Sequence, residues 1–357
     1  MEGAIIDEFT RVGGGQVLSR LIAHTFSENG MTVHFVTDSR HPFLDLKVNM
    51  IETHYDYREN MPYILLLRKI MQTRADLKNI FSKYKFDITF NNHPNMFLYN
   101  ADINALHGFS FLDPIIDEYG NIEKRFIFEA IKRSHLYDIY DGAVFYVNSK
   151  YTLGLAKSLF PRLGIKPRIM KVIYIPVEPK EKVDLSNKMD NTVISIGRIN
   201  KGKNYDLLMD IARKLDDYRF YIVGAVNEGD EKYYDYLMRI KPKNVEIIPN
   251  ADESTKNSLL KKSSIYLHTN RKENYGISIL EAMSYGIIPV VPKSGGPWLD
   301  ITEEGKYGYG YGSVEEAVEV IGSIDQNRRI EVYESMGRFS YDKFKQGIED
   351  LMNTAMK

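Results

Sequence analysis

The sequence predicts an α/β protein with two doubly wound parallel sheets, and three observations support this fold class. Apolar segments of strand length alternate with amphipathic segments of helix length from one end of the chain to the other. The second half repeats the alternation of the first. Between the halves, residues 176–191 are rich in Pro, Lys, Glu and Asp and poor in apolar side chains, which predicts a domain boundary.

Each half supplies several elements of this fold. In the first half, strands are expected at 4–6, 32–37, 88–91 and 143–148, and helices at 16–28 and 64–83. In the second half, strands are expected at 192–196, 219–223, 245–248, 265–268 and 288–291, and helices at 206–215, 232–239, 253–262 and 277–285. Residues 327–356 are helical in character. We therefore expect an N-terminal domain (1–176), a C-terminal domain (177–335) and a C-terminal helix that returns to the N-terminal domain (336–357).

Composition excludes several classes of protein. The chain has 357 residues, of which 43% are hydrophobic, so both domains can have a full core. A formal net charge of −1 argues against nucleic acid as a partner, and the absence of cysteine excludes disulfides and thiolate metal sites. No apolar run approaches the roughly 20 residues of a spanning helix, and the N-terminus lacks the basic region of a signal peptide. A cytoplasmic location is therefore expected.

Residues 273–301 are the most informative stretch. Glu273 stands just before a glycine turn, and Glu281 is expected about two turns into the following helix, on the same side. The amides of Asn274, Tyr275 and Gly276 at the helix start are expected to be unpaired and to favour an anion. Two carboxylates for hydroxyls beside amides for phosphate suit a nucleotide-sugar. The alternative is that both carboxylates cap and solvate one helix.

A glycine-rich segment precedes the first predicted helix. Gly13, Gly14 and Gly15 let the backbone approach a ligand closely, and the helix start favours an anion. The alternative is a plain tight turn. The Gly-x-Gly-x-x-Gly spacing of dinucleotide-binding proteins is absent.

Cationic side chains follow the first strand of the second half. Arg198, Lys201 and Lys203 lie where ligands bind in doubly wound sheets, beyond the carboxyl end of a strand. Arg198 and one lysine could neutralise a departing diphosphate, with Lys203 favoured by its spacing to the next helix. The alternative is a solvated basic loop.

His107 is the histidine best placed for chemistry, because it stands between an apolar segment and a glycine. On a loop it could donate to a sugar hydroxyl, although a lone histidine is more often structural. His93 is a competitor on a neighbouring loop. The histidines show no paired ligand spacing and no Asp-x-Asp is present, so a divalent metal is not implied.

The predicted helix at 64–83 combines an apolar stripe with five basic side chains and one acid, Asp76. Such a helix could lie on an anionic membrane surface, so peripheral membrane contact through 64–85 is one expectation. It is more typical of the solvated outer layer of an α/β domain.

Together these motifs resemble the retaining glycosyltransferases of family 4. The matching segments occur in the family's order along most of the chain: Gly13–Gly15, His107, Val147–Ser149, Ile173–Pro176, Gly197–Lys203, Ile222–Gly224 and Glu273 with Glu281. Three segments are most similar to the dolichol-pathway α-1,2-mannosyltransferases that use GDP-mannose: Gly13–Gly15, Val147–Thr152 and Ser294–Ile301.

The resemblance implies a GT-B fold, in which a first Rossmann-like domain for the acceptor faces a second for the nucleotide-sugar. It implies metal-independent transfer of a hexose, with retention, from a GDP- or UDP-linked donor and without a cofactor; mannose from GDP-mannose is preferred. The implied catalytic residues are His107, Arg198, Lys203 and Glu273. The implied donor-binding residues are Gly14, Gly15, Arg198, Lys203, Pro249, Asn250, Glu273, Asn274, Tyr275, Gly276, Ile277 and Glu281.

Two departures from the family pattern concern Tyr275, where the family usually has Phe, and the N-terminal membrane anchor of eukaryotic relatives, which is not expected here. The acceptor stays open among glycans, polyisoprenyl-linked glycans and small molecules. Two alternatives are a nucleotide-sugar epimerase of the same fold and a non-catalytic nucleotide-sugar-binding subunit.

Overall fold

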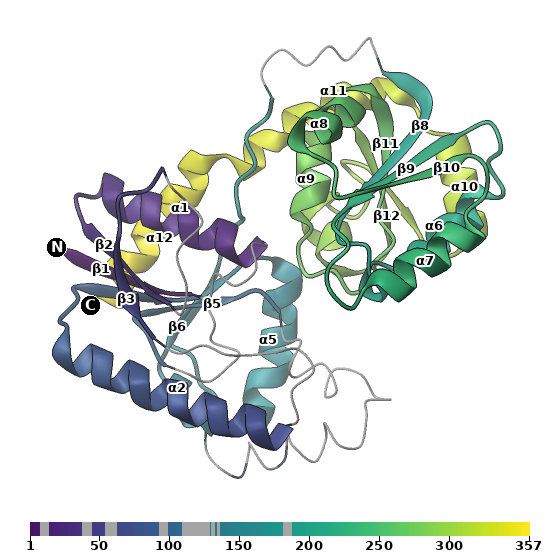
Figure 1. Cartoon of the computed structure of the whole chain (residues 1–357). Coiled ribbons are helices and arrows are strands. Elements are labelled where there is room, and N and C mark those ends of the chain that lie inside the picture. The colour runs from purple at the N-terminus through teal and green to yellow at the C-terminus, as the bar shows by residue number, and fades with distance from the viewer. Residues whose placement is uncertain are drawn as a thin grey trace. The chain divides into compact units, whose positions relative to one another are not determined.

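The computed structural model describes residues 1–7, 14–37, 45–53, 63–92, 99–108, 129, 133, 136–180 and 188–357. The chain divides into two compact units (Figure 1). The first unit contains Met1–Ile175 together with Asp342–Lys357, and the second contains Pro176–Tyr341. Each unit is built on a parallel sheet with helices, so the predicted α/β class is confirmed. Gly13 and His93 lie outside the described residues.

In the first unit, the described strands form a sheet in the order β3-β2-β1-β4-β5-β6-β7, and every pairing is parallel. The strands are β1 (Glu2–Ile6), β2 (Thr32–Thr37), β3 (Asn49–Glu52), β4 (Ile88–Asn91), β5 (Ile103–Leu106), β6 (Val144–Val147) and β7 (Ile169–Val172). The central strands are buried along almost their whole length, as expected for a sheet covered on both faces.

The helices of the first unit are α1 (Gly14–Glu28), α2 (Tyr63–Lys83), α5 (Lys150–Leu163), α12 (Tyr341–Ala355) and the 3-10 turn η2 (Leu136–Tyr140). Helix α5 begins at Lys150 because the Ser149 hydroxyl accepts the Thr152 amide at 3.0 Å. Helix α12 joins the unit from the far end of the chain, through Lys345 to Glu28 of α1 at 2.9 Å and Asp350 to Lys171 of β7 at 3.0 Å.

In the second unit, the strand order is β10-β9-β8-β11-β12-β13, again parallel throughout. The strands are β8 (Met189–Ile196), β9 (Arg219–Gly224), β10 (Val245–Pro249), β11 (Ser263–Leu267), β12 (Ile288–Pro292) and β13 (Tyr309–Tyr311). The helices are α6 (Tyr205–Ala212), α7 (Glu231–Ile240), α8 (Glu253–Lys262), α9 (Ile277–Met283), α10 (Val314–Gly322) and α11 (Arg329–Glu334), with shorter turns at η4 (Lys201–Lys203), η5 (Pro297–Ile301), η6 (Gln326–Arg328) and η7 (Ser335–Phe339). Strands and helices bury a common core that includes Val193, Leu208, Phe220 and Ile265.

The segment at 327–356 contains the end of η6 followed by α11, η7 and α12. Ser340 has an extended backbone, with φ −73° and ψ 153°, and this ends η7 before α12 begins. The helix that packs within the first unit is therefore α12 alone, while η7 belongs to the second unit.

Both sheets reverse their winding at one point. In the first unit the strand order reverses between β1 and β4, and in the second between β8 and β11. Doubly wound proteins bind ligands beyond the carboxyl ends of the strands at such a switch point. The loops after these four strands are therefore the first places to look for function.

Candidate functional site

The switch point of the second unit brings together the loops that follow β8 and β11. After β8, η4 is capped by Asn200, whose side chain accepts the Lys203 amide at 3.2 Å. After β11, the Thr269 hydroxyl donates to the Lys203 carbonyl at 2.6 Å. These hydrogen bonds connect the two loops and hold the backbone of Lys203 in place.

Lys203 and Glu273 meet at this point. Lys203 Nζ lies 2.6 Å from Glu273 Oε2, although the two residues are 70 positions apart in the sequence. Their side chains are only 24% and 21% exposed. Burial by itself would raise the pKa of Glu273, but the Lys203 ammonium, helped by His268 and by hydrogen bonds, outweighs it and lowers that pKa. The Glu273 carboxylate is therefore charged at neutral pH.

His268 is a buried side chain next to this pair. It directly follows β11 with a side chain that is 5% exposed, and its Nε2 lies 3.8 Å from Glu273 Oε2 and has no hydrogen-bond partner among the described residues. Burial lowers the pKa of His268 to about 4, against the opposing effect of Glu273, so the ring is neutral at pH 7. The sequence did not single out His268, because it has no second ligand at a characteristic spacing.

Glycines fix the backbone around the pair. A Cβ at Gly224 would lie 1.9 Å from the Gly197 carbonyl oxygen, and one at Gly296 would lie 2.1 Å from the Asn274 oxygen. The Gly296 amide also donates to the Glu273 carbonyl at 2.9 Å. The turn after β12 therefore packs directly on the loop that carries Glu273, which only a residue without a side chain allows.

Glu281 has its own cationic partner. Its Oε1 lies 2.7 Å from Nζ of Lys256 on α8, which also pairs with Glu253 at 2.9 Å. Burial opposes the charge on Lys256, but these two hydrogen-bonded carboxylates raise its pKa. Both Glu273 and Glu281 act electrostatically on the buried Tyr266 hydroxyl, whose pKa is raised mainly by burial, so the two carboxylates share one neighbourhood.

One expectation about this helix is wrong. Helix α9 begins at Ile277 and ends at Met283, so Glu281 lies just over one turn into it, not two. The helix begins there because Gly276 has φ +110°, which L-residues rarely adopt. The anion-binding role expected for the amides of Asn274, Tyr275 and Gly276 stays a prediction.

The remaining cations differ in their surroundings. Arg198 and Lys201 are exposed, whereas Lys203 is half-buried. Of the two lysines that the sequence left open, Lys203 is the one that reaches Glu273.

Pro249 and Asn250 lie at the carboxyl end of β10, two strands from β8. Asn250 adopts φ +53°, its amide donates to the Gly224 carbonyl at 2.8 Å, and its side chain accepts the Val226 amide at 3.2 Å. The backbone is rigid there and stands on the same edge of the sheet as Lys203.

The other predicted residues belong to the first unit. Gly14 and Gly15 are the first residues of α1, which is the next described element after β1, and His107 directly follows β5. His107 Nε2 lies 2.6 Å from Asn92 Oδ1. These residues gather at the switch point of their own unit.

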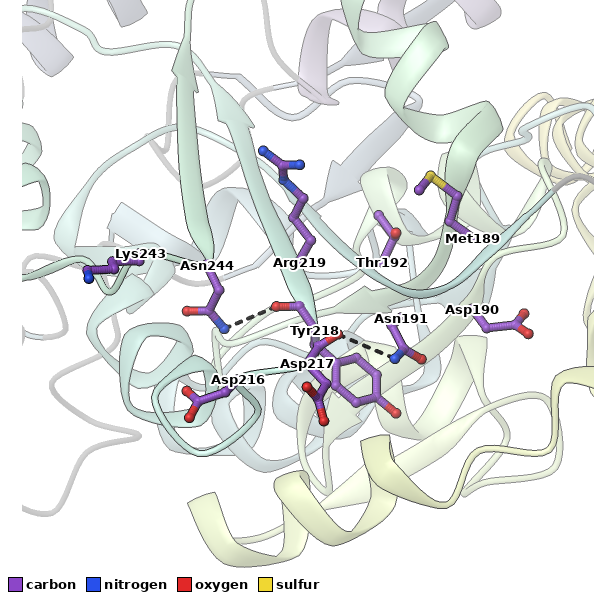
Figure 2. Close-up of a pocket in the computed structure, with 10 residues that line it drawn as sticks. All are labelled: Met189, Asp190, Asn191, Thr192, Asp216, Asp217, Tyr218, Arg219, Lys243 and Asn244. Carbon is purple, nitrogen blue, oxygen red and sulfur yellow. Dashed lines mark hydrogen bonds between the residues drawn. The ribbon is translucent and has the colours of Figure 1, made fainter.

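A pocket of about 720 Å³ lies at the opposite edge of the second sheet (Figure 2). It is lined by the amino ends of β8 and β9 and by the residues before β10. The side-chain amides that line it already donate to backbone carbonyls: Asn244 to that of Tyr218 at 3.1 Å and Asn191 to that of Asp217 at 3.3 Å. Because ligands of such sheets bind at the carboxyl edge, we place the functional site at Lys203 and Glu273 instead.

Comparison with known proteins shows which family the second unit resembles. Residues 177–343 match the family model for glycosyl transferases group 1. The chain is 28% identical over 198 residues to the GDP-Man:Man(3)GlcNAc(2)-PP-Dol alpha-1,2-mannosyltransferase of Dictyostelium discoideum, covering 49% of this chain and 39% of that protein. It is 30% identical over 139 residues to glycogen synthase of Petrotoga mobilis, covering 37% and 29%. The chain thus spans well under half the length of these curated relatives.

The fold is also found in solved structures. HepE from Anabaena, in complex with UDP-glucose, superposes with a TM-score of 0.71 at 16% identity, covering 99% of this chain and 100% of that one. The resemblance to family 4 glycosyltransferases and the two-domain GT-B fold predicted from the motifs are therefore confirmed. Among the described residues, no helix is long and apolar enough to cross a membrane.

Proposed function

We propose that this protein transfers a hexose from a nucleotide-sugar to an acceptor hydroxyl, with GDP-mannose as the first donor to test. One observation carries the proposal: the Lys203 and Glu273 side chains meet at 2.6 Å at the switch point of a unit that matches a glycosyltransferase family model. The mannosyltransferase relatives support mannose, while the glycogen synthase relatives and the UDP-glucose complex of HepE keep other hexoses and UDP in the test.

The proposed reaction breaks the bond between the anomeric carbon and the diphosphate oxygen and forms one to the acceptor oxygen. The acceptor proton passes to the departing diphosphate, and the configuration at the anomeric carbon is retained. Arg198 and Lys203 stabilise the charge that develops on the diphosphate, so the reaction needs no metal ion. Glu273 binds hydroxyls of the donor sugar, and Glu281 binds the ribose. A catalytic role for His107 of the first unit, near the reacting carbon, is part of the proposal.

A thermal-shift panel of nucleoside diphosphates and their sugars, in EDTA, tests the donor. A ligand at about 100 times its Kd stabilises the folded protein by about 2.7 kcal/mol, a clear shift. We expect GDP and GDP-mannose to stabilise the protein without added metal. A response that requires a divalent cation would overturn the metal-independent mechanism, and a response to UDP alone would move the donor to that base.

Incubation with GDP-mannose alone separates the proposed activity from two other functions of this fold. Slow release of GDP supports transfer, with water as a poor acceptor. Recovery of an isomerised sugar would support an epimerase, which needs a group to abstract a sugar proton. Binding without turnover across a panel of glycan, polyisoprenyl-linked and small acceptors would support a non-catalytic subunit.

Peripheral contact with an anionic membrane is part of the proposal for α2. Arg68, Lys78 and Lys83 are exposed on this helix, and Met71, on the same helix, is 53% exposed. We expect sedimentation with vesicles that contain anionic lipid and a weaker association when the three cations are replaced by Glu. Equal sedimentation of both proteins would remove this contact.

A further inference from the structure

A buried polar network surrounds Asn92 at the switch point of the first unit. Asn92 follows β4 and is 2% exposed. Its amide nitrogen lies 3.0 Å from Asp7 Oδ2, 2.9 Å from the Gly15 carbonyl oxygen and 2.9 Å from Ser19 Oγ. Its amide oxygen lies 2.6 Å from Nε2 of His107. The network thus connects the loops after β1, β4 and β5.

These neighbours fix the orientation of the Asn92 amide. The two ends of an amide differ in chemistry, since the nitrogen donates two hydrogens and the oxygen only accepts. The peptide carbonyl of Gly15 can only accept. Turning the amide over would place its oxygen 2.9 Å from the Gly15 carbonyl oxygen, so that two acceptors would face each other without a hydrogen between them. Ser19 does not decide the orientation, because a hydroxyl can donate or accept.

The orientation of Asn92 in turn decides the state of His107. Because the amide oxygen faces the imidazole at 2.6 Å, Nε2 must carry the hydrogen of that contact. We propose that Asn92, held by the Gly15 carbonyl and by Asp7, is a positioning residue that sets His107 in the Nε2–H tautomer. In the neutral ring the other nitrogen, Nδ1, is then an acceptor.

The network also includes the backbone of the glycine segment at the start of α1. What reaches Asn92 is the carbonyl of Gly15, and a Cβ at Gly15 would lie at an ordinary 3.7 Å from the amide nitrogen. A Gly15→Ala variant therefore keeps the contact. The first turn of α1 and the orientation of His107 are consequently coupled, so a displacement of that turn changes the imidazole.

The catalytic part of this inference rests on the proposed sugar transfer, but the tautomer does not, so a spectroscopic test separates the two. The full chain is labelled with ¹⁵N at its 8 histidines, and His107 is assigned by the signal lost in His107→Gln. Long-range ¹H–¹⁵N correlation spectra distinguish a protonated from an unprotonated ring nitrogen. We expect a protonated Nε2 and an unprotonated Nδ1 in the wild type.

Variants of the network complete the test. Asn92→Leu, of similar size, removes the acceptor and should change the His107 signal toward the other tautomer, whereas Ser19→Ala and Gly15→Ala should leave it unchanged. Donor turnover by Asn92→Leu should fall by about 10- to 100-fold, since one oriented hydrogen bond is lost. A protonated Nδ1 in the wild type, or an unchanged His107 signal in folded Asn92→Leu, would overturn the inference. The expected tautomer in a protein without transferase activity would count against the proposed function alone.

Discussion

The two units have the same architecture at their switch points but place different chemistry there. In the first unit the groups that meet are an amide, an imidazole and a buried carboxylate, joined by hydrogen bonds of 2.6 to 3.0 Å around Asn92. In the second unit a half-buried ammonium and a half-buried carboxylate form an ion pair, with a neutral imidazole behind them. The first switch point fixes the orientation of an imidazole, and the second holds two opposite charges close together.

This difference indicates a division of labour. A hydrogen-bond network specifies geometry and responds weakly to a charged ligand, whereas an ion pair can exchange partners when a diphosphate and a polyhydroxyl sugar arrive together. Lys203 would turn from Glu273 to phosphate, and Glu273 from Lys203 to hydroxyls. The predictions below test whether the second unit behaves as this exchange requires.

The largest effect is expected for Lys203→Ala. Loss of a cation that stabilises the leaving diphosphate should lower kcat/KM for the donor by about 100- to 1000-fold. Lys201→Ala is the matched control, because this exposed lysine lies two positions away in the same turn, and it should stay near wild-type activity. Steady-state kinetics with a circular dichroism check of folding measures both. Equal rates for the two variants would remove Lys203 from the diphosphate.

A pH effect of about 3 kcal/mol is expected from His268. Its folded pKa of about 4 lies below its ordinary value of 6.5, so the unfolded chain binds more protons between these values and stability is lost as the pH falls through that window. Urea unfolding followed by fluorescence of the single tryptophan, Trp298, reports on the second unit from pH 7 to 4.5. His268→Gln should show a much smaller loss. Parallel pH curves for the two proteins would mean that His268 is not buried in the neutral form.

The sequence could propose site residues only where they carry local signals. Glu273, Gly276 and Lys203 were identified because a turn, a helix start and a strand end are all visible within a few positions. His268 and Asn92 were not identified as functional, since their roles come from neighbours far away in the chain: Asn92 is 77 positions from Gly15, and its amide is fixed by that carbonyl. Pairings of this kind depend on sheet order, which periodicity does not reveal.

Element boundaries show the same limit. The short strands β3, β5, β7 and β13 were not predicted; β3 is mostly exposed and β7 is only half-buried, so neither carries the buried apolar run that marked β4 and β6. Helix α9 was expected to reach residue 285 but ends at Met283, where the chain turns through Gly286 at φ +68°. The fold class survived these errors because it depends on the alternation of elements and not on their ends.

A loss of about 1 to 3 kcal/mol in unfolding free energy is expected for Gly296→Ala, because the new Cβ would lie 2.1 Å from the Asn274 carbonyl and force the Glu273 loop to move. Gly322→Ala is the control in the same unit, since a Cβ there meets nothing within 4 Å. The Trp298 signal measures both variants. If Gly296→Ala unfolds at the same urea concentration as the control, the turn after β12 does not support the site.

The smallest expected effect is a gain, in the affinity for GDP. Glu273→Gln releases Lys203 from an ion pair worth up to about 1 kcal/mol at this exposure, so free GDP should bind up to about 5-fold more tightly. Turnover should fall in the same variant, because the donor sugar loses its carboxylate partner. Glu253→Gln, which neutralises a carboxylate paired with Lys256 instead, should leave both quantities unchanged. Calorimetry with GDP measures the affinities, and weaker binding by Glu273→Gln would mean that the two charges act together on the nucleotide and do not exchange partners.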